Sequence, residues 1–165
     1  MVSLRKFKPS PKAKFIYFLR AFNLVFLTLI AFLIAIVMAF LKVEIFDFYL
    51  NYLVVASIAI FIIGIIISAI YSNAFYNSVL FEIREDSISK TSGVIFKTIK
   101  VIPYSKITNV EIVQGPILRL LGLASLYIHT AGYSGRYNIA EMEIEGIEVN
   151  VAEEIRNLIL QKIKS

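Results

Sequence analysis

The chain has 165 residues, of which 58% are apolar and 18% are charged, with one histidine and no cysteine. Soluble domains are about 45–50% apolar and about 25% charged, so this composition indicates segments that lie in a membrane. Without cysteine the protein makes no disulfide or thiolate site, and one histidine is too few for the usual ligands of a dedicated zinc site.

The net charge of +5 is concentrated at the N-terminus. Residues 1–20 carry no acidic side chain and six basic ones, namely Arg5, Lys6, Lys8, Lys12, Lys14 and Arg20. From Tyr71 onward, ten basic and ten acidic side chains cancel, so this region lacks the basic footprint of a nucleic-acid-binding domain. We therefore expect a basic tail over residues 1–20 and no nucleic-acid partner.

Two segments, 21–41 and 50–70, contain no charged side chain. As helices they are roughly 31 Å long, which matches the hydrocarbon core of a bilayer. A cleavable signal peptide is the alternative for the first segment, but its apolar region is about 7–15 residues long and is followed by small residues. Here the run is longer and Lys42-Val43-Glu44 follows it. The sequence therefore predicts a two-helix transmembrane hairpin over residues 21–71.

The loop between the two predicted spans fixes their orientation. Only a short connection that includes residues 42–48 separates the spans, so the two helices must be antiparallel neighbours. The N-terminal tail carries a charge of +6 and the loop carries −1, and basic residues stay on the cytoplasmic side of a membrane. We therefore expect a multi-pass protein of the cell membrane with both termini in the cytoplasm.

Small residues recur on one face of each predicted span. They are Ala31, Ala35 and Ala39 in the first span, and Ser57, Gly64 and Ser68 in the second. Small side chains allow the backbones of membrane helices to approach closely. This face can serve packing within the hairpin or contact with a second copy of the chain, so a homo-oligomer stays open. Neither span contains Asp, Glu, Lys, Arg or His, which argues against an ion or proton pathway.

After Ile70 the continuous apolar pattern gives way to short alternating runs separated by turn residues. These runs predict strands over residues 78–84, 87–90, 94–102, 109–114, 125–130 and 139–144. Residues 117–121 predict one helical turn that Gly122 ends, and Asn150–Glu153 matches the capping box of an amphipathic C-terminal helix. This order predicts a mainly-β domain over residues 78–165, a small antiparallel sandwich or open barrel capped by the helix.

Residues 101–132 read VIPYSKITNVEIVQGPILRLLGLASLYIHTAG. Together with the hairpin before them, they resemble the bacterial-type pleckstrin-homology (PH) domain family, in particular its small membrane proteins with two spans ahead of such a domain. The resemblance implies a PH-like fold of seven strands capped by a helix, and it implies no activity. Five residues of the motif are interpreted as structural, because they form turns or end strands and helices: Pro103, Gly115, Pro116, Gly122 and Gly132.

The sequence offers no catalytic motif. His129, the single histidine, lies within a predicted strand, where a structural or surface role is the commoner one. Four glutamates alternate in a way typical of a solvated face, with a carboxylate metal site as the alternative: Glu141, Glu143, Glu145 and Glu148. A Gly-rich phosphate loop, a nucleophile elbow and an HExxH motif are all absent. We expect no enzyme, no cofactor and no catalytic or metal-binding residue.

Two features bear on lipid recognition. The first turn between predicted strands holds Arg84, Glu85 and Asp86, whose charges nearly cancel. The sequence therefore does not support specific binding of a lipid headgroup by the domain itself. The six cations of the basic tail can instead hold anionic headgroups, at about 1 kcal/mol for each cation near the surface. The alternative is that these cations only orient the hairpin.

The segment 117–123 is the best candidate for a contact surface between proteins. It holds five large apolar residues in seven positions, more than one helical turn can bury. We expect Leu118 and Leu121 to pack inward. The expected contact residues are Leu120, Arg119 and Leu123.

These features predict a membrane-anchored PH-like interaction module. Its partners are expected to be the lipid bilayer and other membrane or cytoplasmic proteins, which it binds at the cytoplasmic membrane face as a scaffold or accessory subunit. The alternative function is a membrane protein that senses anionic lipids through the basic N-terminal tail.

Overall fold

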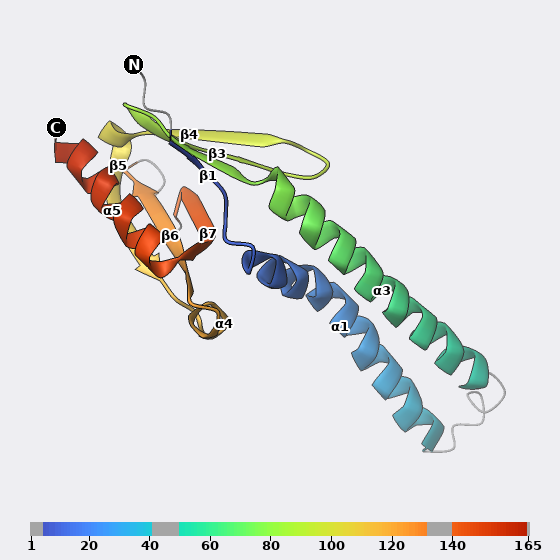
Figure 1. Cartoon of the computed structure of the whole chain (residues 1–165). Coiled ribbons are helices and arrows are strands. Elements are labelled where there is room, and N and C mark those ends of the chain that lie inside the picture. The colour runs from blue at the N-terminus through green and yellow to red at the C-terminus, as the bar shows by residue number, and fades with distance from the viewer. Residues whose placement is uncertain (1–4, 41–49, 132–139, 165) are drawn as a thin grey trace. The chain divides into compact units, whose positions relative to one another are not determined.

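The computed structural model describes residues 5–40, 50–131 and 140–164 (Figure 1). Its contacts divide the chain into two compact units. One is a β-rich domain made of residues 1–16 and 74–165, and the other is a helical unit made of residues 17–73. Residues 5–16 therefore belong to the domain, whereas the sequence predicted a separate tail over residues 1–20.

Two long helices make the helical unit. α1 spans Ala13–Phe40 and α3 spans Leu50–Ser78, so each extends by a few residues into the domain. In the part of the chain that the structure describes, one segment, Val55–Ser78, is long and apolar enough to cross a membrane by its length and composition. This segment covers most of the second predicted span. The first span, 21–41, reaches past the described residues, and the two-span hairpin stays a prediction.

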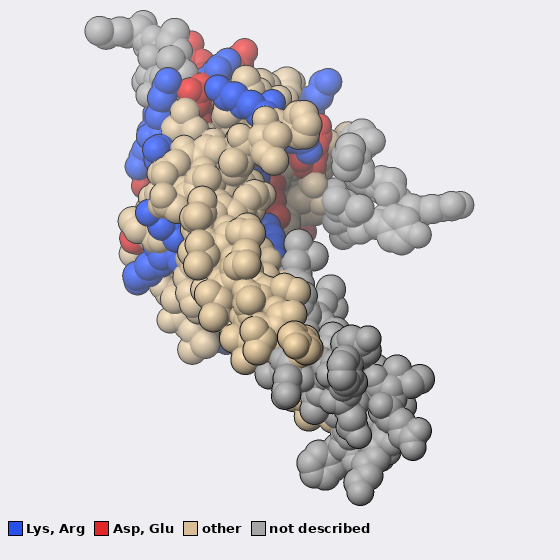
Figure 2. Space-filling view, turned by 90° about the vertical axis from the view of Figure 1, so that its right-hand side faces the viewer, with Lys and Arg blue, Asp and Glu red and all other residues tan. Residues whose placement is uncertain are grey.

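Charged side chains are unevenly distributed over the molecule. On the face in Figure 2, most of the blue and red side chains gather in the upper part of the view, and tan covers most of the remaining described surface. α1 after Arg20 and the whole of α3 carry no charged side chain. Among the residues that the structure describes, the charges therefore belong to the domain and to the first residues of α1.

Within the helical unit, α1 and α3 contact each other through aromatic rings and a glycine. The rings of Phe22 and Phe61 meet edge to face with their centroids 5.9 Å apart. A Cβ added to Gly64 would lie 2.7 Å from both methyl groups of Val25, so only glycine fits at this approach. Ser68, on the same helix, is buried. The other three predicted packing residues have side chains outside the described part of the chain: Ala31, Ala35 and Ala39.

In the described residues of the domain, seven antiparallel strands form two sheets (Figure 1). The first sheet has the strand order β1-β2-β3-β4 and the second has the order β5-β6-β7. The strands are β1 Arg5–Phe7, β2 Leu80–Ile83, β3 Ser87–Ser92, β4 Thr98–Pro103, β5 Ile107–Val113, β6 Leu123–Thr130 and β7 Met142–Glu148. With a C-terminal helix, these two sheets fit the mainly-β PH-like domain that the sequence predicted.

Three helical segments complete the domain: η1 Tyr104–Lys106, α4 Pro116–Leu120 and α5 Val149–Lys164. α5 follows β7 directly, so Asn150 lies within its first turn instead of capping it, and the predicted capping box is wrong. The sequence pattern of this helix predicts an apolar stripe made of Val151, Ile155, Leu158, Ile159 and Ile163. The stripe is confirmed at Ile155 and Ile159, which are both buried. Ile163, near the end of the stripe, is exposed.

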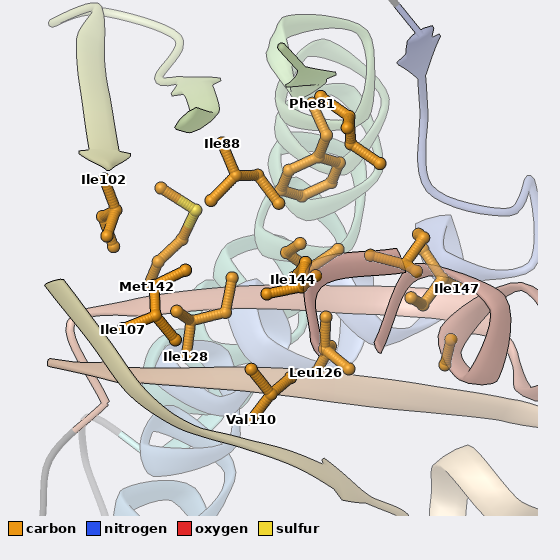
Figure 3. Close-up of a cluster of buried hydrophobic side chains, with 14 of the residues drawn as sticks. Phe81, Ile88, Ile102, Ile107, Val110, Leu126, Ile128, Met142, Ile144 and Ile147 are labelled. Carbon is orange, nitrogen blue, oxygen red and sulfur yellow. The ribbon is translucent and has the colours of Figure 1, made fainter. Parts of the chain in front are cut away.

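Apolar side chains from both sheets and from α5 form one core (Figure 3). Phe81 and Ile88 from the first sheet face Leu126 and Ile144 from the second, and all four are fully buried. α5 covers this core with Ala152, Ile155 and Ile159. Full burial of such a large side chain stabilises a fold by about 1.5–3 kcal/mol, so this cluster holds the two sheets together.

β1 comes from the segment before the helices, which the sequence predicted to be a tail. Arg5–Phe7 pairs antiparallel with β2, and the Phe7 ring stacks on Phe81 with a centroid distance of 5.2 Å. Three residues show too little alternation to be recognised as a strand. The domain is therefore built from segments on both sides of the helical unit in the sequence.

The segment that follows β1 packs against a bulge in β7. The register between β6 and β7 shifts beside Gly146, which has a φ of +77°. Glycine adopts this left-handed conformation without the strain that a Cβ would cause. The carbonyl of Gly146 accepts a hydrogen bond from the N–H of Ser10 at 2.8 Å, and Ala13 is fully buried beside it. The segment from β1 to the start of α1 is thus fastened to the second sheet.

The other predicted strands are found with shifted ends. The predicted strand 94–102 begins only at Thr98, because residues 94–97 form the connection after β3. The predicted strand 139–144 is observed as Met142–Glu148. Gly132 and most of the predicted turn around it fall on residues 132–139, outside the described residues.

Candidate functional site

The connection between β5 and β6 forms α4, at the place where the sequence predicted a helical turn. Pro116 occupies its first turn, where a backbone N–H has no helical partner to lose. Gly122 follows with a φ of +69°, and its N–H donates to the Arg119 carbonyl at 3.2 Å. Pro116 and Gly122 therefore act through backbone geometry, and they hold the turn in one conformation.

The side chains of α4 are exposed to solvent. Leu120 is 88% exposed and Ile117 is 46% exposed. Leu118 and Leu121 are only partly buried, so the prediction that they pack into the core is wrong. The reason is that α4 projects beyond the ends of β5 and β6 and covers none of the core (Figure 1).

The structure corrects one predicted contact residue of this segment. Leu123 is the first residue of β6 and is fully buried, because β6 begins two residues before the predicted strand. It belongs to the interior and is unavailable for a partner. The other two predicted contact residues, Arg119 and Leu120, are exposed and line an open groove together with Gln114 and Pro116.

Two of the six N-terminal cations form ion pairs with acidic residues of the domain. The guanidinium of Arg5 donates two hydrogen bonds to the carboxylate of Glu154, and the Lys6 ammonium lies 3.1 Å from Glu82. The hydrogen bond from Arg5 holds the pKa of Glu154 below its ordinary value of 4.5, and Arg84 with Lys6 lowers the pKa of Glu82 in the same way. These pairs compete with any use of Arg5 and Lys6 as ligands of lipid headgroups.

Two further cations of the segment also contact the domain. The Lys12 ammonium donates to the Leu121 carbonyl at 3.3 Å, so the N-terminal segment reaches the turn that follows α4. The Lys14 ammonium lies 4.9 Å from the centroid of the Tyr76 ring. Lys8 and Arg20 are both exposed. Arg5, Lys6, Lys12 and Lys14 therefore all have partners within the domain.

A second exposed apolar surface lies at the connection between β3 and β4, and the sequence interpretation missed it. Val94, Ile95 and Phe96 are 42%, 83% and 85% exposed. Because the run is apolar throughout, it resembled the start of a buried strand. The signal that marks it as a turn is its position between Gly93, which has a φ of +124°, and Lys97.

Two lysines that the sequence interpretation also missed bridge the sheets. Lys90 and Lys100 stand opposite each other on β3 and β4. The Lys90 ammonium donates to the Glu143 carbonyl at 2.7 Å, and the Lys100 ammonium donates to the Glu141 carbonyl at 2.6 Å. Both line an open pocket between β4 and β7, and their hydrogen bonds tie the edge of the first sheet to the second.

A comparison with protein-family models matches residues 14–163 to the Bacterial PH domain. The chain belongs to the Bacterial PH domain family. The match includes the long helices as well as the domain, and the observed order of two sheets followed by α5 agrees with it. Comparisons with curated proteins and with solved structures find no match.

In this Bacterial PH domain, the single histidine is nearly buried. His129 lies in β6 with 9% of its surface exposed. Its Nε2 atom has no hydrogen-bond partner and lies 3.7 Å from Glu111.

The predicted solvated face of glutamates is wrong in part. Glu145, beside the bulge at Gly146, is 9% exposed. Glu143 accepts a hydrogen bond from the Tyr127 hydroxyl at 2.9 Å, and Glu141 accepts one from Thr130. These acidic side chains serve cross-strand hydrogen bonds. Among the residues that the structure describes, no group of three or more acidic, His or Cys side chains could hold a metal ion.

Proposed function

We propose that this Bacterial PH domain protein is a membrane-anchored interaction module that binds a partner protein through α4. Membership of the family supports a role in protein or lipid interaction. The observation that carries the proposal is the 88% exposure of Leu120 on a turn of fixed geometry. A contact surface on a partner would remove this leucine and its apolar neighbour Ile117 from water.

The anchor in this proposal is the two-span hairpin of residues 21–41 and 50–70. Val55–Ser78 supports it by length and composition, and the first segment supports it by 21 residues without charge. The close approach of Gly64 to Val25 supports pairing of the two helices. The basic residues ahead of the first span support a cytoplasmic location for both termini.

Reporter fusions test this topology. One reporter is joined after Ser165 and another is placed within residues 42–48. We expect a cytoplasmic signal from the first fusion and an exterior signal from the second, because two crossings return the chain to its starting side. An exterior signal from the fusion at Ser165 would overturn the proposed anchor.

Three properties of α4 support a role as a contact. Leu120 and Ile117 supply apolar surface, and Arg119 supplies a planar cation of the kind enriched at the centres of protein interfaces. Pro116 and Gly122 fix the backbone in advance, which lowers the entropic cost of binding. The partner surface expected from this chemistry is an apolar groove with an acidic group at its rim.

The test of the partner contact compares two exposed apolar residues of the domain. Leu120→Asp removes the proposed contact, while Ile163→Asp introduces the same charge near the end of α5, where the side chain is also exposed. Both solubilised full-length variants should melt like the wild-type protein. Mass spectrometry should show that proteins co-purifying with the wild type are lost only in Leu120→Asp. Equal recovery with both variants would exclude α4 as the contact.

The alternative function, sensing of anionic lipids by the N-terminal cations, has weaker support. Arg5 and Lys6 are engaged in ion pairs with Glu154 and Glu82. A sensor would have to break these pairs and the contacts of Lys12 and Lys14, or use Lys8. Replacing Lys8 by Gln and measuring membrane-dependent proteolysis of the N-terminal segment, in vesicles with and without anionic lipid, distinguishes the two functions.

A further inference from the structure

The connection between β3 and β4 presents apolar side chains to solvent at a tight turn. Ile95 and Phe96 are the most exposed of these, at 83% and 85%. Gly93 makes the turn possible, since a Cβ at this position would lie 1.9 Å from the Phe96 carbonyl oxygen. The turn therefore has a fixed shape that holds large apolar groups outward. We name residues Val94–Phe96 the apolar tip.

The exposed apolar surface continues from the apolar tip along β4. Side chains alternate between the two faces of a strand, and Ile102 of β4 points into the core. Ile99 lies on the opposite face with 60% of its surface exposed, and Val101 lies there with 49% exposed. β4 is an edge strand of its sheet, so its outer face and the apolar tip together make one apolar strip.

A hydrogen bond fixes the apolar tip beside the end of α3. The N–H of Gly93, the residue directly before the tip, donates to the Ser78 hydroxyl at 3.2 Å. Ser78 is the last residue of α3 and of Val55–Ser78, the segment with the length and composition of a membrane span. Figure 1 shows the β3–β4 connection beside this end of α3. The apolar tip therefore lies beside the last residue of this apolar segment, eight residues after Ile70, where the proposed second span ends.

Two further features match the boundary between a bilayer and water. Tyr76 lies in the last turns of α3, and tyrosine is enriched at the level of the headgroups. Lys97 follows the apolar tip directly, and a lysine can reach a headgroup while its alkyl chain stays on an apolar surface. Amphipathic helices that bind in the plane of this boundary combine apolar and basic side chains in the same way.

We propose that the apolar tip inserts into the bilayer surface next to the end of α3. Ile95 and Phe96 enter the boundary between headgroups and hydrocarbon, and Lys97 stays among the headgroups. The domain is then held at the membrane by this contact as well as by the helices, which leaves α4 free for the partner. This inference rests on the proposed membrane anchor, and it adds a lipid contact to the domain itself.

The test uses fluorescence, because the wild-type chain contains no tryptophan. Phe96→Trp and Ile95→Trp each place a single reporter at the apolar tip, and the exposure of both positions leaves the fold intact. Leu120→Trp is the matched control, because it places the same reporter at the exposed partner surface. Each full-length variant is reconstituted into phosphatidylcholine vesicles with and without bromine on the lipid chains, since bromine quenches only tryptophan that touches the lipid.

We expect both tip reporters to lose most of their fluorescence in the brominated vesicles, while the Leu120→Trp reporter keeps its fluorescence. Unquenched tip reporters would overturn the inference. If their emission is unquenched but shifted to the blue, protein covers the tip, and this too contradicts the inference. Flotation of the same vesicles after an alkaline wash tests the anchor separately. Protein that floats with unquenched tip reporters leaves the anchor standing, whereas protein lost from the vesicles removes both proposals.

Discussion

Gly146 and Ala13 approach each other so closely that a Cβ added to Gly146 would lie 2.4 Å from the Cβ of Ala13. Ala13 is the first residue of α1, and it is fully buried in the domain. Gly146 lies at the bulge of β7 with a φ of +77°. Two residues more than 130 positions apart in the sequence are therefore fitted to each other, and they join the start of the first long helix to the second sheet.

The first prediction is that Gly146→Ala destabilises the domain. A non-glycine residue in the left-handed conformation costs about 1–2 kcal/mol, and the added methyl group must also displace Ala13. The free energy of unfolding of the solubilised protein, measured with denaturant, should fall by more than the backbone cost alone.

Gly122→Ala is the matched control for this change. Gly122 has a similar φ of +69°, but a Cβ added there meets nothing within 4 Å. It should therefore show only the backbone cost. If both variants lose the same stability, the contact between Gly146 and Ala13 contributes nothing.

The parts of the fold that depend on local signals could be predicted from the sequence. Gly122 ends α4 in the left-handed conformation because the glycine and Pro116 determine that turn within seven residues. Most strands of the domain were found for a similar reason, since alternation and turn residues define them locally. The apolar stripe of α5 repeats every three to four residues and could also be recognised.

The parts that depend on distant partners could not be predicted. β1 is three residues long, and its partner strand lies more than 70 positions away, after both long helices. Leu123 was expected at the surface because the start of β6 has no local marker, and only its pairing with Glu148 places it in a strand. The exposure of the apolar tip depends on whether another element covers it. The local sequence holds no information about such an element.

The second prediction concerns the N-terminal segment as part of the domain. Residues 1–16 joined to 74–165 by a flexible linker should fold cooperatively and melt at a higher temperature than residues 78–165 alone. The longer chain keeps the pairing of β1 with β2, the stacking of Phe7 on Phe81 and the burial of Ala13. The contact of Lys14 with the Tyr76 ring brings the two ends to be joined close together.

Circular dichroism melts of the two chains test this prediction. An Ala13→Asp variant of the longer chain is the control, because it buries an unpaired charge and should remove most of the gain. Equal melting temperatures for the long and short chains would mean that residues 1–16 are an independent tail, as the charge pattern alone had indicated.

The third prediction is a loss of domain stability in acid. The hydrogen bonds from Arg84 and Lys6 lower the pKa of Glu82, and the hydrogen bond from Arg5 lowers the pKa of Glu154. A carboxyl with a lowered pKa in the folded state stabilises the fold above its unfolded value of 4.5. This contribution is lost as the pH falls from 4.5 through the folded pKa.

Melting temperatures measured from pH 7 to pH 3 should therefore decline below pH 4.5. The decline should be smaller in Glu82→Gln, which removes one of the titrating groups. Salt should weaken the effect, because Arg5 and Glu154 are both about half exposed and are screened. An unchanged acid profile in Glu82→Gln and in Glu154→Gln would contradict this assignment.

The fourth prediction concerns Tyr104 at alkaline pH. Tyr104 is 3% exposed in η1, and its hydroxyl donates to the Arg84 carbonyl at 3.0 Å. Burial and the nearby charge of Asp86 raise the pKa of this phenol from 10.0 to about 12. A raised pKa means that the folded state prefers the neutral phenol, so its contribution to stability is complete below pH 10. That contribution should be lost as the pH rises from 10 to about 12.

Tyr104→Phe separates this titration from those of the other eight tyrosines. The variant should be less stable at pH 7, by about 1 kcal/mol for the lost hydrogen bond. Between pH 10 and 12 its stability should fall less steeply than that of the wild type, because the buried phenol no longer ionises on unfolding. When the pH is raised, the tyrosinate absorbance at 295 nm of the folded variant should lack the last step, near pH 12, that the wild type shows. Tryptophan does not interfere with this measurement because the chain has none. An identical late step in both proteins would assign it to another tyrosine and would leave Tyr104 without a part in the alkaline transition.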